Sequence, residues 1–297
     1  MPVQATGAKP WFMALRPKTL TAALAPIIVA TALVRFEGKP ILWWVSICAL
    51  LSSCFIQIGT NLFNDALDFE KGADTHTRIG PQRVTQSGLL THKQVMVGGG
   101  ICFLIAALLG VPLVMQGGWP IVAIGLVSLF LGYAYTGGPF PLAYKGLGDL
   151  FVIVFFGLVA VTGTYYLHTL EFSTTALVAG LQVGMLATVL IAINNLRDAP
   201  EDARCGKHTL AVRFGVGFAR VEIAFLVIAP FLLGAFWGRT GAQSAAVLPI
   251  IAFPIARRVI AGVWKNAPSP IYNQFLAMGA GLQMLFAILL AIGLWLR

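Results

Sequence analysis

Apolar residues run in long, nearly uninterrupted stretches along this chain, and polar residues gather in the short segments between them. A helix needs about 20 mostly apolar residues to cross a bilayer. Stretches near that length cover residues 19–36, 41–62, 94–116, 119–136, 147–168, 173–195, 219–238, 242–262 and 273–296. The pattern predicts an all-α fold, a polytopic membrane bundle of nine transmembrane helices.

Composition agrees with this prediction. Apolar residues make up 58% of the chain and charged residues 10%, with a mean hydropathy of +0.84. Soluble proteins have about a quarter of their residues charged. The N-terminal apolar run follows basic residues, as a signal peptide does, but further apolar segments follow it, so we expect a retained helix. The four cysteines suggest neither a disulfide nor a zinc site.

No linker divides the chain, so we expect one transmembrane domain over residues 1–297. Two halves, roughly 19–136 and 147–262, repeat one pattern, and a ninth helix at 273–296 follows them. In each half an apolar helix ends in an Asn/Asp cluster, which a basic loop containing glycine follows. The two clusters are four helices apart, so both lie on the same side of the membrane.

Basic residues orient the chain, because Lys and Arg concentrate in cytoplasmic loops. With the N-terminus inside, sixteen of the twenty Lys and Arg residues are cytoplasmic, and only Arg35, Lys39, Arg239 and Arg297 lie outside. This distribution predicts a multi-pass protein of the inner membrane, with both Asn/Asp clusters cytoplasmic and the C-terminus outside. The net charge of +9 suits an anionic leaflet and an anionic substrate, and implies no nucleic-acid partner.

The two Asn/Asp clusters are the strongest candidate for chemistry, since carboxylates at a bilayer boundary are costly unless they are paired or bind a ligand. The first cluster contains Asn61, Asn64, Asp65 and Asp68, with Asp74 beyond it; the second contains Asn194, Asp198 and Asp202. The spacings are i, i+4 and i+7 for Asn61, Asp65 and Asp68, and i, i+4 and i+8 for the second trio. Each trio therefore forms a stripe on one helix face.

Oxygen ligands without His or Cys partners suit Mg²⁺, which completes its shell with water and phosphate. The predicted metal ligands are Asn61, Asp65, Asp68, Asp74, Asn194, Asp198 and Asp202. The nearby cations that a diphosphate would need are Lys71, Arg78, Arg83, Lys145, Arg197 and Lys207. The alternative is that the acids are ordinary helix-terminal charges neutralised by these cations. Two stripes on one membrane face favour the metal site.

These motifs resemble those of the UbiA superfamily of intramembrane aromatic prenyltransferases, and the resemblance covers nearly the whole chain. Residues 64–74 look like its first aspartate motif and residues 194–202 like its second. Within the superfamily the likeness is greatest to members that prenylate 1,4-dihydroxy-2-naphthoate in menaquinone synthesis. Three stretches carry it, at residues 78–83, 135–149 and 194–213.

The chain departs from the family pattern in places. Many members have an acid four residues after the central Asp of the first motif, where this chain has Phe69. This leaves open whether Asp68 or Asp74 binds metal directly. Pro200 lies within the second motif and predicts that the helix ends or kinks there, with Asp202 on a turn.

The resemblance implies a catalytic mechanism. Magnesium and basic side chains would stabilise the diphosphate that leaves a polyprenyl diphosphate, and an aromatic ring would attack the resulting cation in a central cavity with an opening toward membrane lipid. Asp65, Asp68, Asp198, Asp202 and Lys145 are the expected catalytic residues, and Asn61, Asn64, Lys71, Arg78, Arg83, Asn194, Arg197 and Lys207 the expected substrate-binding residues. Lys145 and Arg83 are candidates to contact the acceptor carboxylate.

Other functions remain as alternatives. Within the superfamily, the acceptor would instead be 4-hydroxybenzoate or homogentisate. In a different class, intramembrane acids also serve cation-coupled transporters, but transporter sites lie near the bilayer midplane, and here the clusters lie at helix ends. The Asp-Gly-rich signature of the CDP-alcohol phosphotransferases is absent from the sequence.

Overall fold

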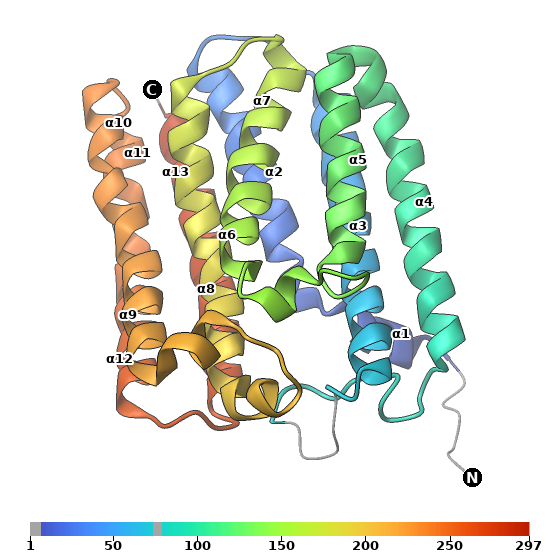
Figure 1. Cartoon of the computed structure of the whole chain (residues 1–297). Coiled ribbons are helices and arrows are strands. Elements are labelled where there is room, and N and C mark those ends of the chain that lie inside the picture. Colours follow the sequence, from blue (N-terminus) through green and yellow to red (C-terminus); the bar gives the residue numbers. More distant parts are fainter. Residues whose placement is uncertain (1–6, 74–78, 297) are drawn as a thin grey trace.

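The computed structural model describes residues 7–73 and 79–296, and its regular structure is helical within those ranges (Figure 1). The elements are α1 Ala8–Leu15, η1 Pro17–Thr19, α2 Thr21–Phe36, α3 Trp43–Glu70, α4 His92–Gly117, α5 Trp119–Ala134, η2 Leu142–Lys145, α6 Gly148–Val152, η3 Ile153–Val159, α7 Ala160–Thr169, α8 Thr174–Arg204, α9 Leu210–Leu233, α10 Ala235–Arg239, α11 Gln243–Val247, η4 Leu248–Ala252, α12 Phe253–Lys265 and α13 Tyr272–Trp295. The all-α prediction is confirmed.

Among the described residues, seven helical runs are long and apolar enough to cross a membrane. They are Trp43–Glu70, His92–Gly117, Gly148–Thr169, Thr174–Arg204, Leu210–Arg239, Gln243–Lys265 and Tyr272–Trp295. An eighth is reached only if α1 and α2, which meet at a 50° bend, count as one span, while α5 has only 16 residues. The chain is a multi-pass membrane protein, but the predicted count of nine spans is not confirmed.

Helix α8 forms the centre of the bundle. In its most apolar 18-residue stretch 78% of the residues are buried, against 17% in α4, which lies at the edge. Helix α8 packs against α9, η3, α13 and α2. Figure 1 shows α4 on one side of the bundle and α9 with α12 on the other. Apolar residues that point outward from such peripheral helices face lipid, as in other membrane bundles.

Three glycines allow η3 to approach α8 closely. A Cβ atom built on Gly157 of η3 would lie 2.4 Å from the carbonyl oxygen of Gly180 and 2.5 Å from the Cα of Gly184, both in α8. Small residues at helix contacts are the usual means of close approach in membranes. This contact positions α6 and η3, which form part of the wall of the central cavity described below.

We expect Gly157→Val to lower the free energy of unfolding by about 3 kcal/mol, because the new side chain would collide with backbone atoms that cannot rotate away. The measurement is the apparent Tm of the detergent-solubilised protein. Gly100→Ala in α4 is the matched control, since a Cβ there meets nothing within 4 Å. An unchanged Tm in the valine variant would contradict the close approach.

Helices α3 and α8 extend beyond their predicted ends, to Glu70 and Arg204, and they carry the Asn/Asp clusters on their last turns. The prediction that α8 ends at Pro200 is wrong, since the helix continues through it to Arg204. The predicted kink stays a prediction. Proline removes a single hydrogen-bond donor, and the packing of α8 in the bundle centre outweighs that loss. Asp202 therefore lies on the helix rather than on a turn.

The two helices end in the same way. Gly72 after α3 and Gly206 after α8 adopt left-handed φ angles of 68° and 69°. The next N–H groups, of Ala73 and Lys207, donate to the carbonyl oxygens of Asp68 and Asp202 at 2.9 and 2.8 Å. A glycine is favoured where a helix ends in this conformation. Both acids therefore stand four residues before their terminating glycine.

Candidate active site

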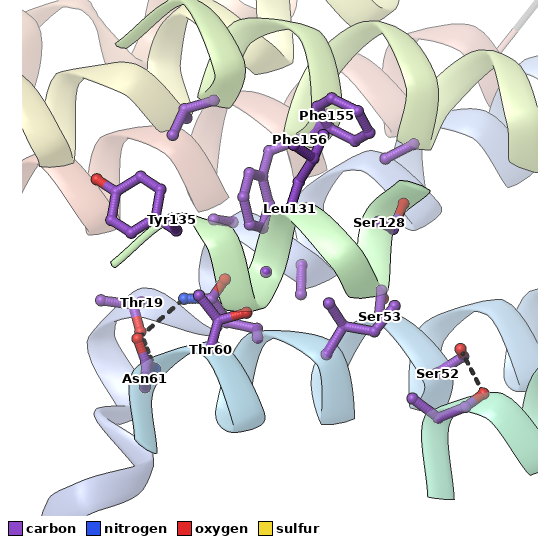
Figure 2. Close-up of a pocket in the computed structure, with 18 of the residues that line it drawn as sticks. Thr19, Ser52, Ser53, Thr60, Asn61, Ser128, Leu131, Tyr135, Phe155 and Phe156 are labelled. Atoms are coloured by element: carbon purple, nitrogen blue, oxygen red, sulfur yellow. Dashed lines mark hydrogen bonds between the residues drawn. The ribbon is translucent and has the colours of Figure 1, made fainter. Parts of the chain in front are cut away.

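A cavity of about 930 Å³ lies between the helices. Its charged and amide lining residues come from α3 and α8, from the loops that follow these two helices, and from the bend between α1 and α2: Arg16, Lys18, Gln57, Asn61, Asn64, Asp65, Gln82, Arg83, Asn194, Asn195 and Lys207. We call this group the polar end. The walls beyond it are mainly apolar and include Phe151, Phe155 and Phe156. Figure 2 shows Thr19, Asn61 and Tyr135 together, with Phe155, Phe156 and Ser128 further along the pocket.

The first cluster is held by hydrogen bonds to two other parts of the chain. The Asn61 amide donates to the carbonyl oxygen of Leu15 at 3.1 Å and to Thr19 Oγ1 at 3.0 Å. The Asn64 amide donates to Asp68 Oδ2 at 2.8 Å and to Thr136 Oγ1 at 2.9 Å. These bonds bring the bend between α1 and α2, and the loop after α5, to the polar end.

Asp65 anchors the loop that follows the first cluster. Its two carboxylate oxygens accept backbone N–H groups from Val84 at 3.2 Å and Thr85 at 3.0 Å, and only 2% of the residue is exposed. The adjacent Arg83 lines the cavity, with its guanidinium 3.7 Å from Asp68 Oδ2. Asp65 therefore helps to position a cation at the polar end.

Tyr144 lies between the two clusters. Its hydroxyl donates to Asp68 Oδ1 at 2.9 Å, and the ammonium groups of Lys71 and Lys207 lie 4.6 and 5.8 Å from its ring centroid. Lys207 also pairs with Asp202 Oδ1 at 3.5 Å. Burial and the Asp68 carboxylate raise the pKa of the Tyr144 phenol, so it stays protonated. Burial lowers the pKa of Lys71, which also donates to the carbonyl oxygen of Thr136.

Arg197 organises the second cluster. Its guanidinium, fully buried, donates to both carboxylate oxygens of Asp198 at 2.7 Å and to Asn194 Oδ1 at 2.5 Å. It also donates to Asn273 Oδ1 at 2.6 Å, and the Asn273 amide donates to the carbonyl oxygen of Ile79 at 3.3 Å. Arg197 therefore ties the second cluster to α13 and, through Asn273, to the loop after the first.

The structure brings part of the predicted site together at the cavity surface. The predicted residues that line the cavity are Asn61, Asn64, Asp65, Arg83, Asn194 and Lys207. Those that lie outside the lining, next to it or behind it, are Asp68, Lys71, Lys145, Arg197, Asp198 and Asp202. Asp74 and Arg78 lie outside the described residues.

Lys145 differs most from its predicted position. Its side chain is exposed, and its ammonium lies 5.5 Å from the ring centroid of Phe140. The loop around it is fixed, because Arg213 Nη2 donates to the Lys145 carbonyl oxygen at 3.0 Å. In this conformation Lys145 does not reach the cavity, while Arg83, the other candidate for the acceptor carboxylate, does.

Sequence reasoning missed several residues at the site. Arg16 is one of the sixteen basic residues assigned above to the cytoplasmic side, with no further role predicted. In the structure it lines the cavity, donates to Asn64 Oδ1 at 3.1 Å and has a left-handed φ of 51°. Strained backbone of this kind gathers at functional sites. Thr136, Asn195 and Asn273 also join the polar network. The left-handed backbone and the contact of Asn273, 76 residues from Arg197, leave no mark in the local sequence.

The donor set is suited to a hard divalent cation. Asp202 Oδ2 is buried and forms no hydrogen bond, which leaves a carboxylate lone pair for a ligand. Carboxylate and amide oxygens are the preferred ligands of magnesium. Within residues 7–73 and 79–296, no three His, Cys, Asp or Glu side chains are close enough to hold a metal ion by themselves. A magnesium ion here would therefore depend on water and substrate phosphate for part of its shell.

Comparison with known proteins gives concordant results. The sequence model described as the UbiA prenyltransferase family matches residues 23–279. A curated Haemophilus influenzae protein named 1,4-dihydroxy-2-naphthoate octaprenyltransferase is 34% identical over 96% of each chain. An Escherichia coli protein of the same name is 36% identical over 77% of this chain and 79% of its own.

A solved structure supports the fold. The apo structure of a UbiA homolog from Aeropyrum pernix K1 has a TM-score of 0.69, with 14% sequence identity over 92% of this chain and 96% of that one. At this identity the likeness concerns the fold alone. The overall arrangement of helices is thus shared with a protein described as a UbiA homolog.

Proposed function

Because the chain belongs to the UbiA prenyltransferase family, we propose that it transfers a polyprenyl group from an allylic diphosphate to 1,4-dihydroxy-2-naphthoate, with loss of CO₂, to give a demethylmenaquinol. The identity with curated dihydroxynaphthoate octaprenyltransferases over nearly the whole chain carries this proposal. The cavity supports it, since a polar end adjoins long apolar walls. Such a shape suits a substrate with a charged head and an isoprenoid tail.

The polar end would bind the diphosphate. We propose that Asn61, Asp65, Asp68, Asn194, Asp198 and Asp202, with Asp74, supply the oxygen ligands for Mg²⁺. The chemistry that a magnesium ion held by these residues would supply is neutralisation of charge on the diphosphate. Arg83 and Lys207 line the same end and add positive charge of their own. Lys71 lies beside Asp68 and Tyr144, close enough to contribute to the same field.

Arg197 would act on the second cluster rather than on the substrate. Its guanidinium is fully buried and bound to Asp198, Asn194 and Asn273. A bidentate arginine fixes the direction of a carboxylate. We propose that Arg197 orients Asp198 and Asn194 for the metal and diphosphate, in place of the direct diphosphate contact predicted from sequence.

The apolar walls would protect the reacting carbon. When the allylic C–O bond breaks, its electron pair leaves with the diphosphate, and water would quench the cation that remains. The walls contributed by η3 and α5 exclude water along the prenyl chain. The ring carbon that bears the carboxylate then bonds to the prenyl C1. The bond to the carboxylate breaks, its electron pair restores the aromatic ring, and CO₂ leaves.

We propose that the polar end faces the cytoplasm of a bacterial cell, across the inner membrane from the C-terminus. The concentration of basic residues around the two clusters supports this orientation. Figure 1 shows α1 at the end of the bundle opposite to that where α13 ends. The proposed partners are polyprenyl diphosphate, the aromatic acceptor and surrounding lipid.

Product analysis tests the proposed function. We expect the purified, detergent-solubilised protein to convert 1,4-dihydroxy-2-naphthoate and an allylic diphosphate to a prenylated, decarboxylated naphthoquinol, detected by mass spectrometry. EDTA should abolish the product and added Mg²⁺ should restore it, because the carboxylates alone cannot neutralise a diphosphate.

Parallel incubations with 4-hydroxybenzoate and homogentisate test the acceptor. Product with either of these acceptors and not with the naphthoate would support the proposed prenyl transfer but would show that the acceptor is a different aromatic compound. Folded protein that is silent with all three acceptors would overturn the proposal and favour the transporter alternative.

A further inference from the structure

Asp149 is a buried acid that belongs to neither Asn/Asp cluster. It lies at the start of α6, with 4% of its surface exposed. Its Oδ2 accepts a hydrogen bond from the Asn195 amide nitrogen at 3.4 Å, and its Oδ1 is buried without a hydrogen-bond partner. A carboxylate kept in such a position is costly. Its side-chain hydrogen bond to Asn195 connects it to the site.

The carboxylate determines how the Asn195 amide is turned. A carboxylate accepts hydrogen bonds, so the amide must present its NH₂ group to Asp149. The carbonyl oxygen of Asn195 then points the other way. Asn195 lines the central cavity, and no residue in the described part of the chain donates a hydrogen bond to this oxygen. Asn195 therefore has a carbonyl oxygen that is available to accept a hydrogen bond at this point of the cavity.

This acceptor lies where the polar end meets the apolar wall. Ile191, one turn before Asn195, and Phe151, close after Asp149, both line the cavity. Tyr135 also lines it, and a Cβ on Gly148 would lie 3.1 Å from the Tyr135 hydroxyl, so the absent side chain leaves room for that phenol (Figure 2). A reacting ring must lie at this boundary, since the prenyl C1 joins the diphosphate to the tail.

We propose that Asn195, oriented by Asp149, accepts a hydrogen bond from a ring hydroxyl of the aromatic acceptor. The inference rests on the proposed function. Attack by the ring places positive charge on its hydroxyl oxygen, so this hydrogen bond strengthens as the C–C bond forms. A diphosphate has no hydroxyl hydrogen to offer at neutral pH, so the carbonyl oxygen discriminates in favour of the phenolic substrate. Asp149 is a positioning residue.

Steady-state kinetics test this assignment in the full chain with Mg²⁺, with the concentrations of the acceptor and of the allylic diphosphate varied separately. Asn195→Leu and Asp149→Asn should each raise the acceptor KM about tenfold, the effect of one hydrogen bond. The KM for the allylic diphosphate should change less than about twofold in both variants. Thr188→Val is the matched control, because Thr188 contacts the Asp149 backbone at 3.5 Å without touching its carboxylate. It should leave both KM values unchanged.

A binding measurement extends the test to variants with low turnover. The two mono-O-methyl ethers of 1,4-dihydroxy-2-naphthoate compete with the acceptor for the wild-type protein, and methylation of the contacted hydroxyl should weaken binding about tenfold. Asn195→Leu should bind that ether and the parent acceptor equally. The inference would be overturned by a variant that keeps the wild-type acceptor KM and still distinguishes the parent acceptor from its methyl ether. It would also be overturned by a variant in which the KM for the allylic diphosphate, or the Mg²⁺ concentration needed for activity, rises.

The inference and the proposed function fail differently. Wild-type protein without naphthoquinol product means that the proposed function has failed, and the inference for this acceptor with it. Wild-type turnover combined with unaltered variants means that the inference alone has failed. Apparent Tm values exclude unfolding as the cause of a raised KM.

Discussion

Asp202→Asn should reduce prenyl transfer by about a thousandfold while leaving the protein folded, an effect of the size found when a strong electrostatic contact at the reacting charge is removed. Its Oδ2 is buried without a hydrogen bond, and its Oδ1 lies 3.5 Å from Lys207. The amide removes the negative charge that a metal would use and breaks few contacts within the protein. The loss should therefore fall on the metal and diphosphate, and little on stability.

Turnover and the Mg²⁺-dependent rise in apparent Tm are the two measurements for this variant. We expect Asp202→Asn to lose both while its Tm without metal stays near the wild-type value. Glu70→Gln is the matched control, an exposed acid at the end of α3 that pairs with His92 at 3.5 Å. It should keep both properties. Wild-type turnover by Asp202→Asn would remove Asp202 from the metal site.

Asp198→Asn should lower the free energy of unfolding by about 3 kcal/mol and also abolish turnover, because it leaves a buried guanidinium without its counter-charge. Arg197 is 0% exposed and Asp198 6%, and the two form a bidentate pair. Loss of one partner from a buried pair costs more than loss of both. The double variant Arg197→Met, Asp198→Asn should therefore be more stable than Asp198→Asn alone.

Chemical denaturation in detergent, with turnover measured in parallel, separates the two effects. Recovery of stability in the double variant without recovery of activity would show that the pair serves the site rather than the fold. A single variant as stable as the wild type would contradict the buried pairing. Arg197→Lys is a useful third variant, because it keeps the charge and loses the bidentate geometry.

Much of the helical framework could be predicted from the sequence because hydrophobic length determines it. The predicted segment 94–116 became α4 and 273–296 became α13, each within a residue or two. The errors in the predicted helix boundaries lie where the length of the apolar stretch does not determine where the helix ends. Helices α3 and α8 continue past the apolar stretch for eight or nine residues, since their polar ends pack against loops of the protein rather than against lipid.

Many residues of the candidate site could also be predicted from the sequence, but the contacts between them could not. Helical spacing placed Asn61 and Asp65 on one face, and both line the cavity. Three-dimensional packing decided which cations reach it: Arg83 enters, because Asp65 anchors its loop, while Lys145 turns outward over Phe140. No local pattern encodes these outcomes. The duplication of the two halves and the predicted metal ligands stay predictions.

The glycine turns that end α3 and α8 limit where insertions and deletions can occur in these two helices. Each acid is fixed by its own main-chain hydrogen bond to the residue after the glycine, Ala73 or Lys207. One residue inserted between acid and glycine would rotate the glycine turn, and the loop that follows it, by about 100° around the helix axis relative to the acid, and would break this hydrogen bond. Insertions and deletions in these helices should therefore accumulate at their other ends, near Trp43 and Thr174, where the register of the acids is untouched.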